Sequence, residues 1–366
     1  MKILYTAAIY DSSGYAEAAR NYIAALLTQP GIEISCRPVS FEDWRTDLGY
    51  HTDIIKPTLN KSIQPDIQII HLTPENFPRC ILPGIKNIGY TVWETTRLPS
   101  AWVGYINKLD EVWVPCDWNK DVFRASGVTI PIKKIPHTID LQEINRAKDI
   151  ELEPIPKTGY RFYSIFQWSA RKNPEGLIKA YLSEFAHDEP VTLVLKTYIG
   201  KNNNEDRTHT IDAINSIKRD LQLHNEPTPR IKLIHGGLSR DEMISLHRQC
   251  DCFVLPHRAE GWGVPHFEAM AVGNPVITTG FSGNLEFMNG KTSYLVDFSM
   301  TPVSGMGKPT YNGKAEWAEP NLSNLRYLMR DVFSNQAHAK EKGLLGREYV
   351  SKFNWDKIGK LMVESL

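Results

Sequence analysis

The sequence predicts two α/β domains, each built around a parallel β-sheet with helices on both faces. The chain has 366 residues, more than a single hydrophobic core usually organises. Short apolar runs alternate with helical segments through both halves, which is typical of parallel strands joined by crossover helices. Between the halves, Asp140–Thr158 is charged and interrupted by prolines, which favours a linker.

The N-terminal half begins with a strand, a turn and a helix. Ile3–Ile9 is an apolar run that predicts the strand, and Asp11–Tyr15 is the turn. Ala16–Leu27 predicts the helix, because its apolar residues recur with helical spacing on one side. Further strands are expected at residues 66–71, 87–92 and 111–115, interleaved with helical segments. We expect residues 1–145 to form an N-terminal domain.

A second alternation of strands and helices begins at Tyr160. Its strands are expected at residues 161–167, 191–197, 231–235, 252–255 and 276–279. Its helices are expected near residues 175–185, 206–223, 240–249, 264–272, 322–334 and 337–352. Residues 158–352 would form the C-terminal domain, and a last helix would lie within residues 353–366.

The composition is that of a globular protein with balanced charge. Acidic and basic residues number 42 each, which argues against a nucleic-acid-binding protein and against a strongly basic membrane face. The five cysteines form no CxxC pair and no even framework, which fits a reducing cytosol. Asp11 interrupts the apolar start before it reaches the length of a membrane span or signal core. We expect a cytoplasmic protein with at most peripheral contact to the inner face of a membrane.

The most informative segment is Glu260–Glu268, which reads Glu-Gly-Trp-Gly-Val-Pro-His-Phe-Glu and lies between two predicted strands. Gly261 and Gly263 let the backbone approach a ligand closely where the unpaired amides of a helix start collect. The two carboxylates, eight positions apart, can accept hydrogen bonds from sugar hydroxyls. These features predict a site for a phosphorylated, polyhydroxylated ligand at the carboxyl ends of parallel strands.

This segment, continued by Ala-Met-Ala-Val-Gly-Asn-Pro-Val-Ile-Thr, resembles the Glu-x7-Glu signature of the family 4 (group 1) retaining glycosyltransferases. The resemblance implies the GT-B fold: two Rossmann-like domains whose parallel sheets face across a cleft, with the C-terminal helix crossing back to the first domain. It also implies polysaccharide biosynthesis, with a UDP- or GDP-linked nucleotide-diphosphate sugar as donor. The acceptor would be a carbohydrate, lipid-linked or other hydroxyl. The alternative is a generic βαβ crossover with surface acids.

The resemblance assigns roles to the residues of the signature and of the turn after the next strand. Glu260 would accept hydrogen bonds from the transferred sugar, and Glu268 from the ribose of the nucleotide. The donor-binding turn comprises Gly261, Trp262, Gly263 and Val264. The later segment Phe281-Ser-Gly-Asn-Leu-Glu resembles a family turn whose backbone amides face the donor, which adds Gly283 to the site.

Arg171 and Lys172 follow the first predicted strand of the second half and are expected to hold the diphosphate. An arginine binds phosphate as a fork and a lysine binds it as a point charge. The pair resembles the phosphate-binding residues of the family, whose commoner form is Gly-Arg-x4-Lys. This chain lacks the Gly-Arg pair, so Lys172 is the direct match and Arg171 the substitute. Together with Glu260 they are the predicted catalytic residues, and Lys196, near the end of another strand, would be a third cation for the donor.

Two loops of the N-terminal half complete the predicted site. The turn Asp11–Tyr15 resembles the first loop of the family, which would bring backbone amides of Gly14 and Tyr15 near the donor phosphate or the acceptor. The plain alternative is an ordinary helix start with a serine cap. After another strand, Trp93 would stack on a sugar face and Glu94 would accept from a hydroxyl in the acceptor cleft.

No Asp-x-Asp sequence occurs, and the eleven histidines show no zinc-binding spacing. We therefore expect neither a metal nor another cofactor, with positive charge supplied by basic side chains and helix dipoles. Two alternatives stay open. One is a different enzyme on the same fold, a nucleotide-sugar epimerase or an α-glucan phosphorylase. The other is a non-catalytic glycan- or nucleotide-binding protein on a GT-B frame.

Overall fold

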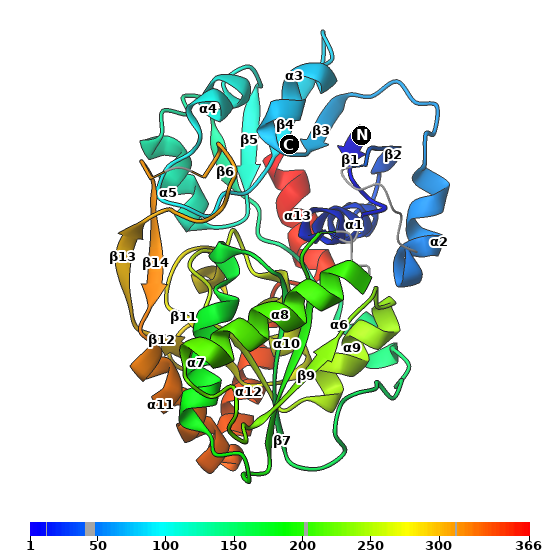
Figure 1. Ribbon diagram of the computed structural model, residues 1–366. Helices are drawn as coiled ribbons and strands as arrows, with labels where there is room; N and C mark the ends of the chain where they lie inside the picture. Colours follow the sequence, from blue (N-terminus) through cyan, green and yellow to red (C-terminus); the bar gives the residue numbers. More distant parts are fainter. Residues whose placement is uncertain (12, 41–47, 201–203, 312) are drawn as a thin grey trace. The chain divides into compact units, whose positions relative to one another are not determined.

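The computed structural model describes residues 1–366 except 12, 41–47, 201–203 and 312. The chain divides into two compact units, residues 1–145 with 351–366 and residues 146–350. Each unit has a central sheet flanked by helices (Figure 1). Both sheets contain six strands, and every pairing within them is parallel. The predicted α/β class is therefore confirmed.

The sheet of the first unit has the strand order β2-β1-β3-β4-β5-β6. Its strands are β1 (Lys2–Ala7), β2 (Glu33–Pro38), β3 (Ile67–His71), β4 (Lys86–Tyr90), β5 (Glu111–Val114) and β6 (Ile132–Lys134). The helices are α1 (Gly14–Leu27), α2 (Thr52–Ile55), α3 (Phe77–Cys80), α4 (Ser100–Ile106), α5 (Asp117–Ala125), α6 (Leu141–Arg146) and α13 (Trp355–Ser365). Short 3-10 segments are η1 (Gly49–His51), η2 (Lys56–Thr58) and η3 (Pro74–Asn76). All five residues of β3 are buried, as expected for a central strand covered on both faces.

The sheet of the second unit has the order β12-β11-β10-β7-β8-β9. Its strands are β7 (Tyr160–Gln167), β8 (Val191–Tyr198), β9 (Arg230–Ile234), β10 (Cys252–Leu255), β11 (Val276–Thr279) and β12 (Tyr294–Val296). The helices are α7 (Pro174–Glu184), α8 (Asn204–Asp220), α9 (Arg240–Gln249), α10 (Val264–Val272), α11 (Leu322–Ser334) and α12 (Gln336–Val350), with 3-10 segments η4 (Ala170–Lys172) and η5 (Gly283–Glu286). An antiparallel hairpin of β13 (Phe298–Pro302) and β14 (Glu316–Pro320) stands apart from the sheet.

The last helix returns to the first unit, as the resemblance implied. In Figure 1, α13 lies beside α1. The two helices approach so closely that a Cβ atom on Gly359 would stand 2.1 Å from the carbonyl oxygen of Ala25. The indole N–H of Trp355 donates to Oδ1 of Asn21 at 2.9 Å. The C-terminal segment is thus part of the core of the first unit.

The segment expected to be a linker contains a helix and forms backbone hydrogen bonds with α9. Its first part forms α6. Beyond α6, the backbone N–H of Ile150 donates to Oγ of Ser245 at 2.9 Å, and that of Leu152 donates to Oε1 of Gln249 at 3.1 Å. Both acceptors lie on α9, so the segment after residue 145 groups with the second unit.

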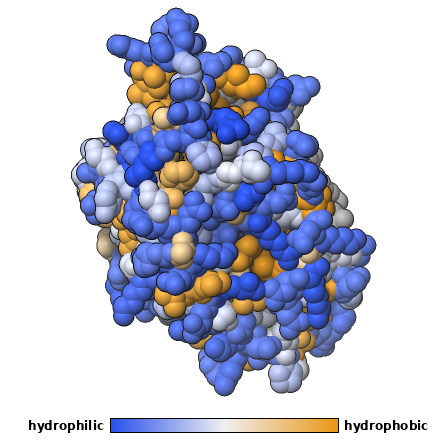
Figure 2. Space-filling view, turned by 90° about the horizontal axis from the view of Figure 1, so that it is seen from below, coloured by the Kyte–Doolittle hydropathy of each residue, from blue (hydrophilic) through white to orange (hydrophobic). Residues whose placement is uncertain are grey.

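Among the described residues, no helix is long and apolar enough to cross a membrane. Figure 2 shows one face of the molecule, on which hydrophilic side chains dominate and apolar side chains appear in separate small areas. Isolated apolar side chains of this kind are ordinary on protein surfaces.

The close approach of α1 and α13 generates a stability prediction. Gly359→Ala should lower the free energy of unfolding of the first unit by about 1–3 kcal/mol, because the added methyl group overpacks the helix contact. Gly104→Ala in α4 is the matched control, since a Cβ there meets nothing within 4 Å and alanine is the better helix former. Urea unfolding followed by circular dichroism measures both. Equal stability of the two variants would contradict the described packing.

Candidate functional site

The turn from β10 into α10 has the geometry predicted from its glycines. Gly263 has a φ of 99°, a left-handed conformation that strongly favours glycine, and a Cβ there would lie 2.8 Å from Nδ1 of His266. Helix α10 begins at the next residue, with Pro265 in its first turn and Gly273 in left-handed conformation at its end. No side chain caps its N-terminus. The first amides of α10 thus depend on other groups or a ligand.

The three predicted catalytic residues form one cluster, in which Glu260 is buried and the two cations are partly buried. The η4 segment follows β7 and carries Arg171 and Lys172. The ammonium of Lys172 pairs with Oε1 of Glu260, and Nη1 of Arg171 lies 3.3 Å from Oε2. Arg171 also donates to the carbonyl of Ala259 at 2.9 Å. The side chains are only 12%, 17% and 6% exposed for Lys172, Arg171 and Glu260, so water screens these charges weakly.

The cluster carries a net positive charge at neutral pH. Burial alone would raise the pKa of Glu260, but the charges of Lys172 and Arg171 outweigh it and hold that pKa well below its usual range. Two buried histidines lie beside the cluster. Burial lowers the pKa of His266 to about 4 and that of His257 well below its usual value, so both are neutral. The carboxylate of Glu260 thus lies beside two cationic side chains.

Two residues at the start of η5 form hydrogen bonds with the backbone of Glu260. The N–H of Glu260 donates to Oγ of Ser282 at 2.9 Å, and the N–H of Gly283 donates to the carbonyl of Glu260 at 2.9 Å. A Cβ on Gly283 would lie 2.1 Å from the carbonyl oxygen of Gly261. Gly283 is therefore required for a close approach of two loops, and its amide serves that approach. The expectation that this turn faces the donor stays a prediction.

Trp262 also differs from its predicted role. Its ring is buried and packs against Phe267 and Phe287, with centroid distances of 5.4 and 4.8 Å. The indole anchors the turn in the core. The donor-binding role expected for Gly261–Val264 stays a prediction.

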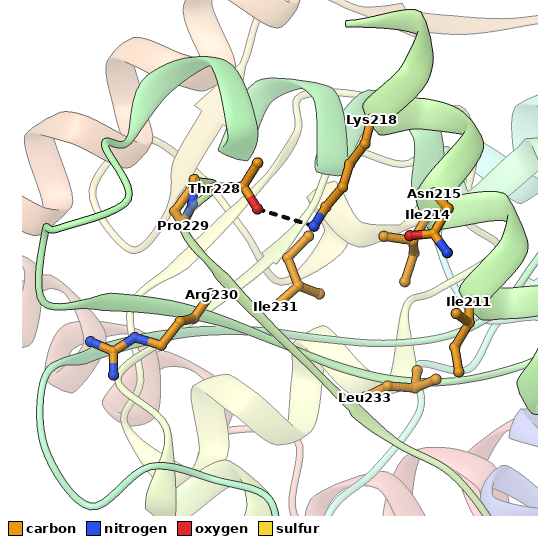
Figure 3. Close-up of a pocket in the computed structure, with 9 residues that line it drawn as sticks. All are labelled: Ile211, Ile214, Asn215, Lys218, Thr228, Pro229, Arg230, Ile231 and Leu233. Atoms are coloured by element: carbon orange, nitrogen blue, oxygen red, sulfur yellow. Dashed lines mark hydrogen bonds between the residues drawn. The ribbon is translucent and has the colours of Figure 1, made fainter. Parts of the chain in front are cut away.

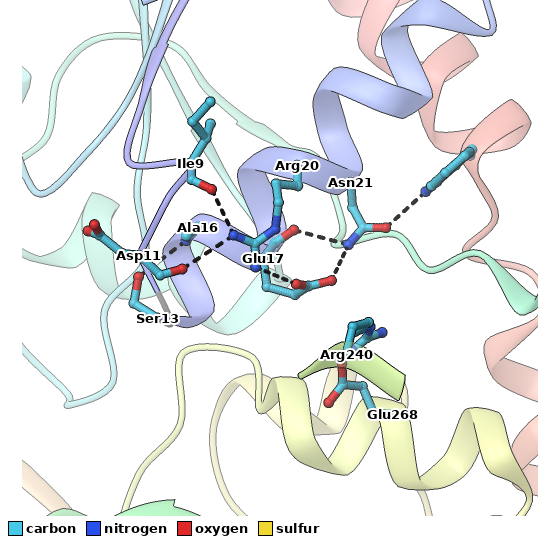
Figure 4. Close-up of polar contacts among 10 residues, drawn as sticks. Ile9, Asp11, Ser13, Ala16, Glu17, Arg20, Asn21, Arg240 and Glu268 are labelled. Atoms are coloured by element: carbon cyan, nitrogen blue, oxygen red, sulfur yellow. Dashed lines mark hydrogen bonds and ion pairs between the residues drawn. The ribbon is translucent and has the colours of Figure 1, made fainter. Parts of the chain in front are cut away.

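Glu268 lies inside α10 and has two neighbours that the sequence analysis did not identify. Arg240, the first residue of α9, forms an ion pair with Oε1 of Glu268, shown in Figure 4. Nε2 of His247 lies 3.6 Å from Oε2. No sequence spacing connects α9 with α10. The one available signal is a basic residue at the N-terminus of a helix, where the helix dipole favours acids.

Lys196 lies in β8 and is buried. Burial lowers the pKa of its ammonium to about 8 and is the one cause of that shift. Its nearest described aromatic contact is the ring of Tyr198, 5.9 Å from Nζ. A buried ammonium of this kind gains strongly from an anionic ligand.

The first loop of the N-terminal unit is an ordinary capped helix start. Oγ of Ser13 accepts from the backbone N–H of Ala16, and α1 begins at Gly14. Figure 4 shows that Arg20 of α1 donates back to the carbonyl of Ile9, at 2.8 Å, and so braces this loop. These contacts support the plain alternative. They leave the role of the Gly14 amide near a phosphate untested.

The predicted acceptor residues Tyr15 and Trp93 form hydrogen bonds with other residues of the first unit. The hydroxyl of Tyr15 lies 2.9 Å from Oγ1 of Thr91 and accepts from the N–H of Val92, and burial raises its pKa. Trp93 is buried, and its indole N–H donates to the carbonyl of Arg97 at 2.7 Å. Its ring therefore belongs to the core, which corrects the expectation that it stacks on a sugar. Glu94, the next residue, is partly exposed.

A surface cavity of about 300 Å³ lies elsewhere, between α8 and β9 (Figure 3). Its lining consists of Ile211, Ile214, Asn215, Lys218, Thr228, Pro229, Arg230, Ile231 and Leu233. The lining contains no carboxylate and none of the predicted site residues. We place the chemistry at the Glu260 cluster because charge and burial converge there. Within the described part of the chain, no group of three or more His, Cys, Asp or Glu side chains is arranged to hold a metal ion.

Part of the chain matches a known protein family. Residues 145–301 match the family model described as glycosyl transferases group 1. This segment is therefore similar to group 1 glycosyltransferases. The match contains both carboxylates and the basic pair, which were singled out from the sequence.

Two curated relatives match this chain over similar lengths. An uncharacterized glycosyltransferase, MJ1178 of Methanocaldococcus jannaschii, is 32% identical over 123 residues, which cover 33% of this chain and 29% of the relative. A D-inositol 3-phosphate glycosyltransferase of Paenarthrobacter aurescens is 24% identical over 125 residues, or 34% of this chain and 26% of the relative. The matched region thus spans less than a third of either relative.

Solved structures resemble the whole chain. Anabaena Alr3699/HepE in complex with UDP and glucose has a TM-score of 0.67 at 14% identity, covering 100% of this chain and 99% of that one. Sucrose-phosphate synthase from Thermosynechococcus elongatus has a TM-score of 0.70 at 14% identity, covering 100% and 98%. At this identity the likeness shows the fold, and the fold is GT-B.

The buried ammonium of Lys196 generates a pH prediction. Its folded pKa of about 8 lies below the ordinary 10.5, so the charged form opposes folding. This penalty is complete below the folded pKa and disappears as the pH rises towards the ordinary value. Lys196→Met should therefore raise the free energy of unfolding by up to about 3 kcal/mol at pH 7, and by much less near pH 10.

The exposed Lys291→Met is the control, and denaturant unfolding at both pH values is the measurement. A gain from Lys196→Met that is equal at the two pH values would assign the effect to packing and contradict the charge argument.

Proposed function

We propose that the protein is a retaining glycosyltransferase of family 4 that transfers a hexose from a UDP- or GDP-linked sugar to a hydroxyl acceptor. The observation that carries the proposal is the cluster of Lys172, Arg171 and Glu260 next to the start of α10. The family match and the bound UDP in the Anabaena structure support it.

The leaving diphosphate is the group on which the cations act. As the bond between the sugar C1 and the phosphate oxygen breaks, negative charge grows on that oxygen. Lys172 and Arg171 are preorganised by Glu260 in a site that screens them weakly, so they stabilise this charge without reorganisation. The uncapped amides of α10 add dipoles of the same sign.

The two carboxylates bind different parts of the donor. Glu260 accepts from hydroxyls of the transferred sugar, and Glu268 accepts from the ribose. In the retaining reaction, the acceptor oxygen attacks C1 on the face from which the phosphate leaves, and its proton passes to a phosphate oxygen. No enzyme carboxylate forms a bond to the sugar.

The remaining proposals concern the cofactor, the acceptor and the location. The basic side chains supply the charge that a metal supplies in other transferases, so we propose metal-independent catalysis. Glu94 remains the acceptor-side candidate, for a carbohydrate or lipid-linked hydroxyl in polysaccharide biosynthesis. We propose a cytoplasmic enzyme with at most peripheral contact to the inner membrane face.

Lys172→Met tests the catalytic role. If Lys172 stabilises charge that develops only as the donor bond breaks, the substitution should lower kcat by about 10²–10³ and donor affinity far less. The control is Lys179→Met on α7, a lysine whose partner is Glu175 in the same helix turn. Product formation from a responsive nucleotide sugar, slow hydrolysis included, is measured in excess EDTA, and wild-type activity should persist there.

Two results would contradict the proposal. Activity that disappears in EDTA and returns with manganese or magnesium would remove the metal-independent mechanism. Tight donor binding with no turnover in the wild type would favour the non-catalytic binding protein.

A further inference from the structure

A buried file of polar side chains lies behind Glu268 in the second unit. Nδ2 of Asn274 lies 3.0 Å from the hydroxyl of Tyr163, and that hydroxyl lies 2.7 Å from Nδ1 of His247. Nε2, on the other side of the imidazole ring, lies 3.6 Å from Oε2 of Glu268. All four residues are buried. The file therefore runs from the end of α10 through β7 and α9 and back to α10.

Hydrogen-bond donors and acceptors along the file determine where its protons are. Nδ2 of Asn274 also faces the carbonyl oxygens of His247, at 2.5 Å, and Cys250, at 3.3 Å, so the amide must present its NH2 group there. The hydroxyl of Tyr163 accepts from that amide and donates its own proton to Nδ1 of His247. The imidazole then carries a proton on Nε2, which faces the carboxylate of Glu268.

Nε2 of His247 has no hydrogen-bond partner among the described residues, although it is buried. A buried donor left unpaired is costly, and Oε2 of Glu268 is slightly too far away to satisfy it. Arg240 holds the other oxygen of the same carboxylate. A small rotation of Glu268 towards a ligand, away from Arg240, would bring Oε2 within hydrogen-bonding range of Nε2.

We propose that His247 is a positioning residue that holds Glu268 in the orientation that reads the ribose hydroxyls, and so determines the preference for ribonucleotides over deoxyribonucleotides. The inference rests on the proposed function, in which Glu268 accepts from the ribose. Asn274 and Tyr163 act through His247, because they keep its proton on the nitrogen that faces Glu268.

The experiment measures the dissociation constants of UDP and GDP and of their 2′-deoxy analogues by calorimetry on the full chain. The wild type should bind its ribonucleotide roughly tenfold or more tighter than the deoxy analogue, as for a hydrogen bond to a charged group. His247→Leu should reduce this ratio to about threefold or less, because the donor to Glu268 is gone. His247→Gln keeps an N–H donor and should retain most of the ratio.

Ile244→Ala is the matched control, because Ile244 is buried one turn earlier on α9 and is not part of the file. It loosens the helix without touching a hydrogen bond, so the ratio should stay at the wild-type value. Should His247→Leu fail to fold, Tyr163→Phe removes one oxygen from the file and should also reduce the ratio.

An unchanged ratio in the folded His247→Leu or Tyr163→Phe variant would overturn this inference and leave the proposed function standing. An equal fall in Ile244→Ala would overturn it too, since the effect would then belong to the helix as a whole. A wild type that binds neither UDP nor GDP would overturn the proposed function itself.

Discussion

The buried ion pair between Lys172 and Glu260 is the interaction around which the ligand-facing loops of the second unit are arranged. Each partner lies in a different loop, one after β7 and one after β10, and neither charge is well hydrated. Removing one partner of a buried pair typically costs about 3–5 kcal/mol, because the other charge is left uncompensated. The backbone N–H of Arg258 donates to the carbonyl of Arg171 at 2.7 Å and joins the same two loops. The protein itself therefore holds the two cations in place.

Arg258 extends this arrangement beyond the segment that matches the family model. Its guanidinium donates to the carbonyl of Ala170 in η4 and forms a two-pronged ion pair with Glu319 of β14. The β13–β14 hairpin is thus connected to η4 through one side chain. Since a fork of this kind fixes both position and angle, the hairpin contributes to the rigidity of the cations.

Sequence reasoning was most accurate where the signal is local. The bounds of α9, α10 and β10 agree with the expectation, because periodicity, caps and glycines mark them directly. It missed β2, β6, β12 and the β13–β14 hairpin. Strands β6 and β12 have only three residues each, β2 contains an arginine and a proline, and β13 is largely exposed, so none of them shows a long apolar run.

The residues of the candidate site were likewise predicted only in part from the sequence. Lys172, Arg171 and Glu260 were predicted together because the carboxyl ends of parallel strands meet at one edge of a sheet. The burial of Trp262 and Trp93 was not predicted. The sequence of a motif does not distinguish a tryptophan that stacks on a sugar from one that fills a core. Arg240 and His247 reach Glu268 through space from another helix, and contacts of that kind follow only from the packed structure.

The central proposal is that Glu260 accepts hydrogen bonds from the transferred sugar, while Lys172 and Arg171 bind the diphosphate. Calorimetry of Glu260→Gln with UDP and UDP-glucose, and with GDP and GDP-mannose, tests it most directly. The account predicts that the free diphosphate binds the variant at least as tightly as the wild type, because a negative charge beside the phosphates is gone. The added affinity that the sugar provides should be lost. Equal weakening of the diphosphate and of the nucleotide sugar would contradict the account.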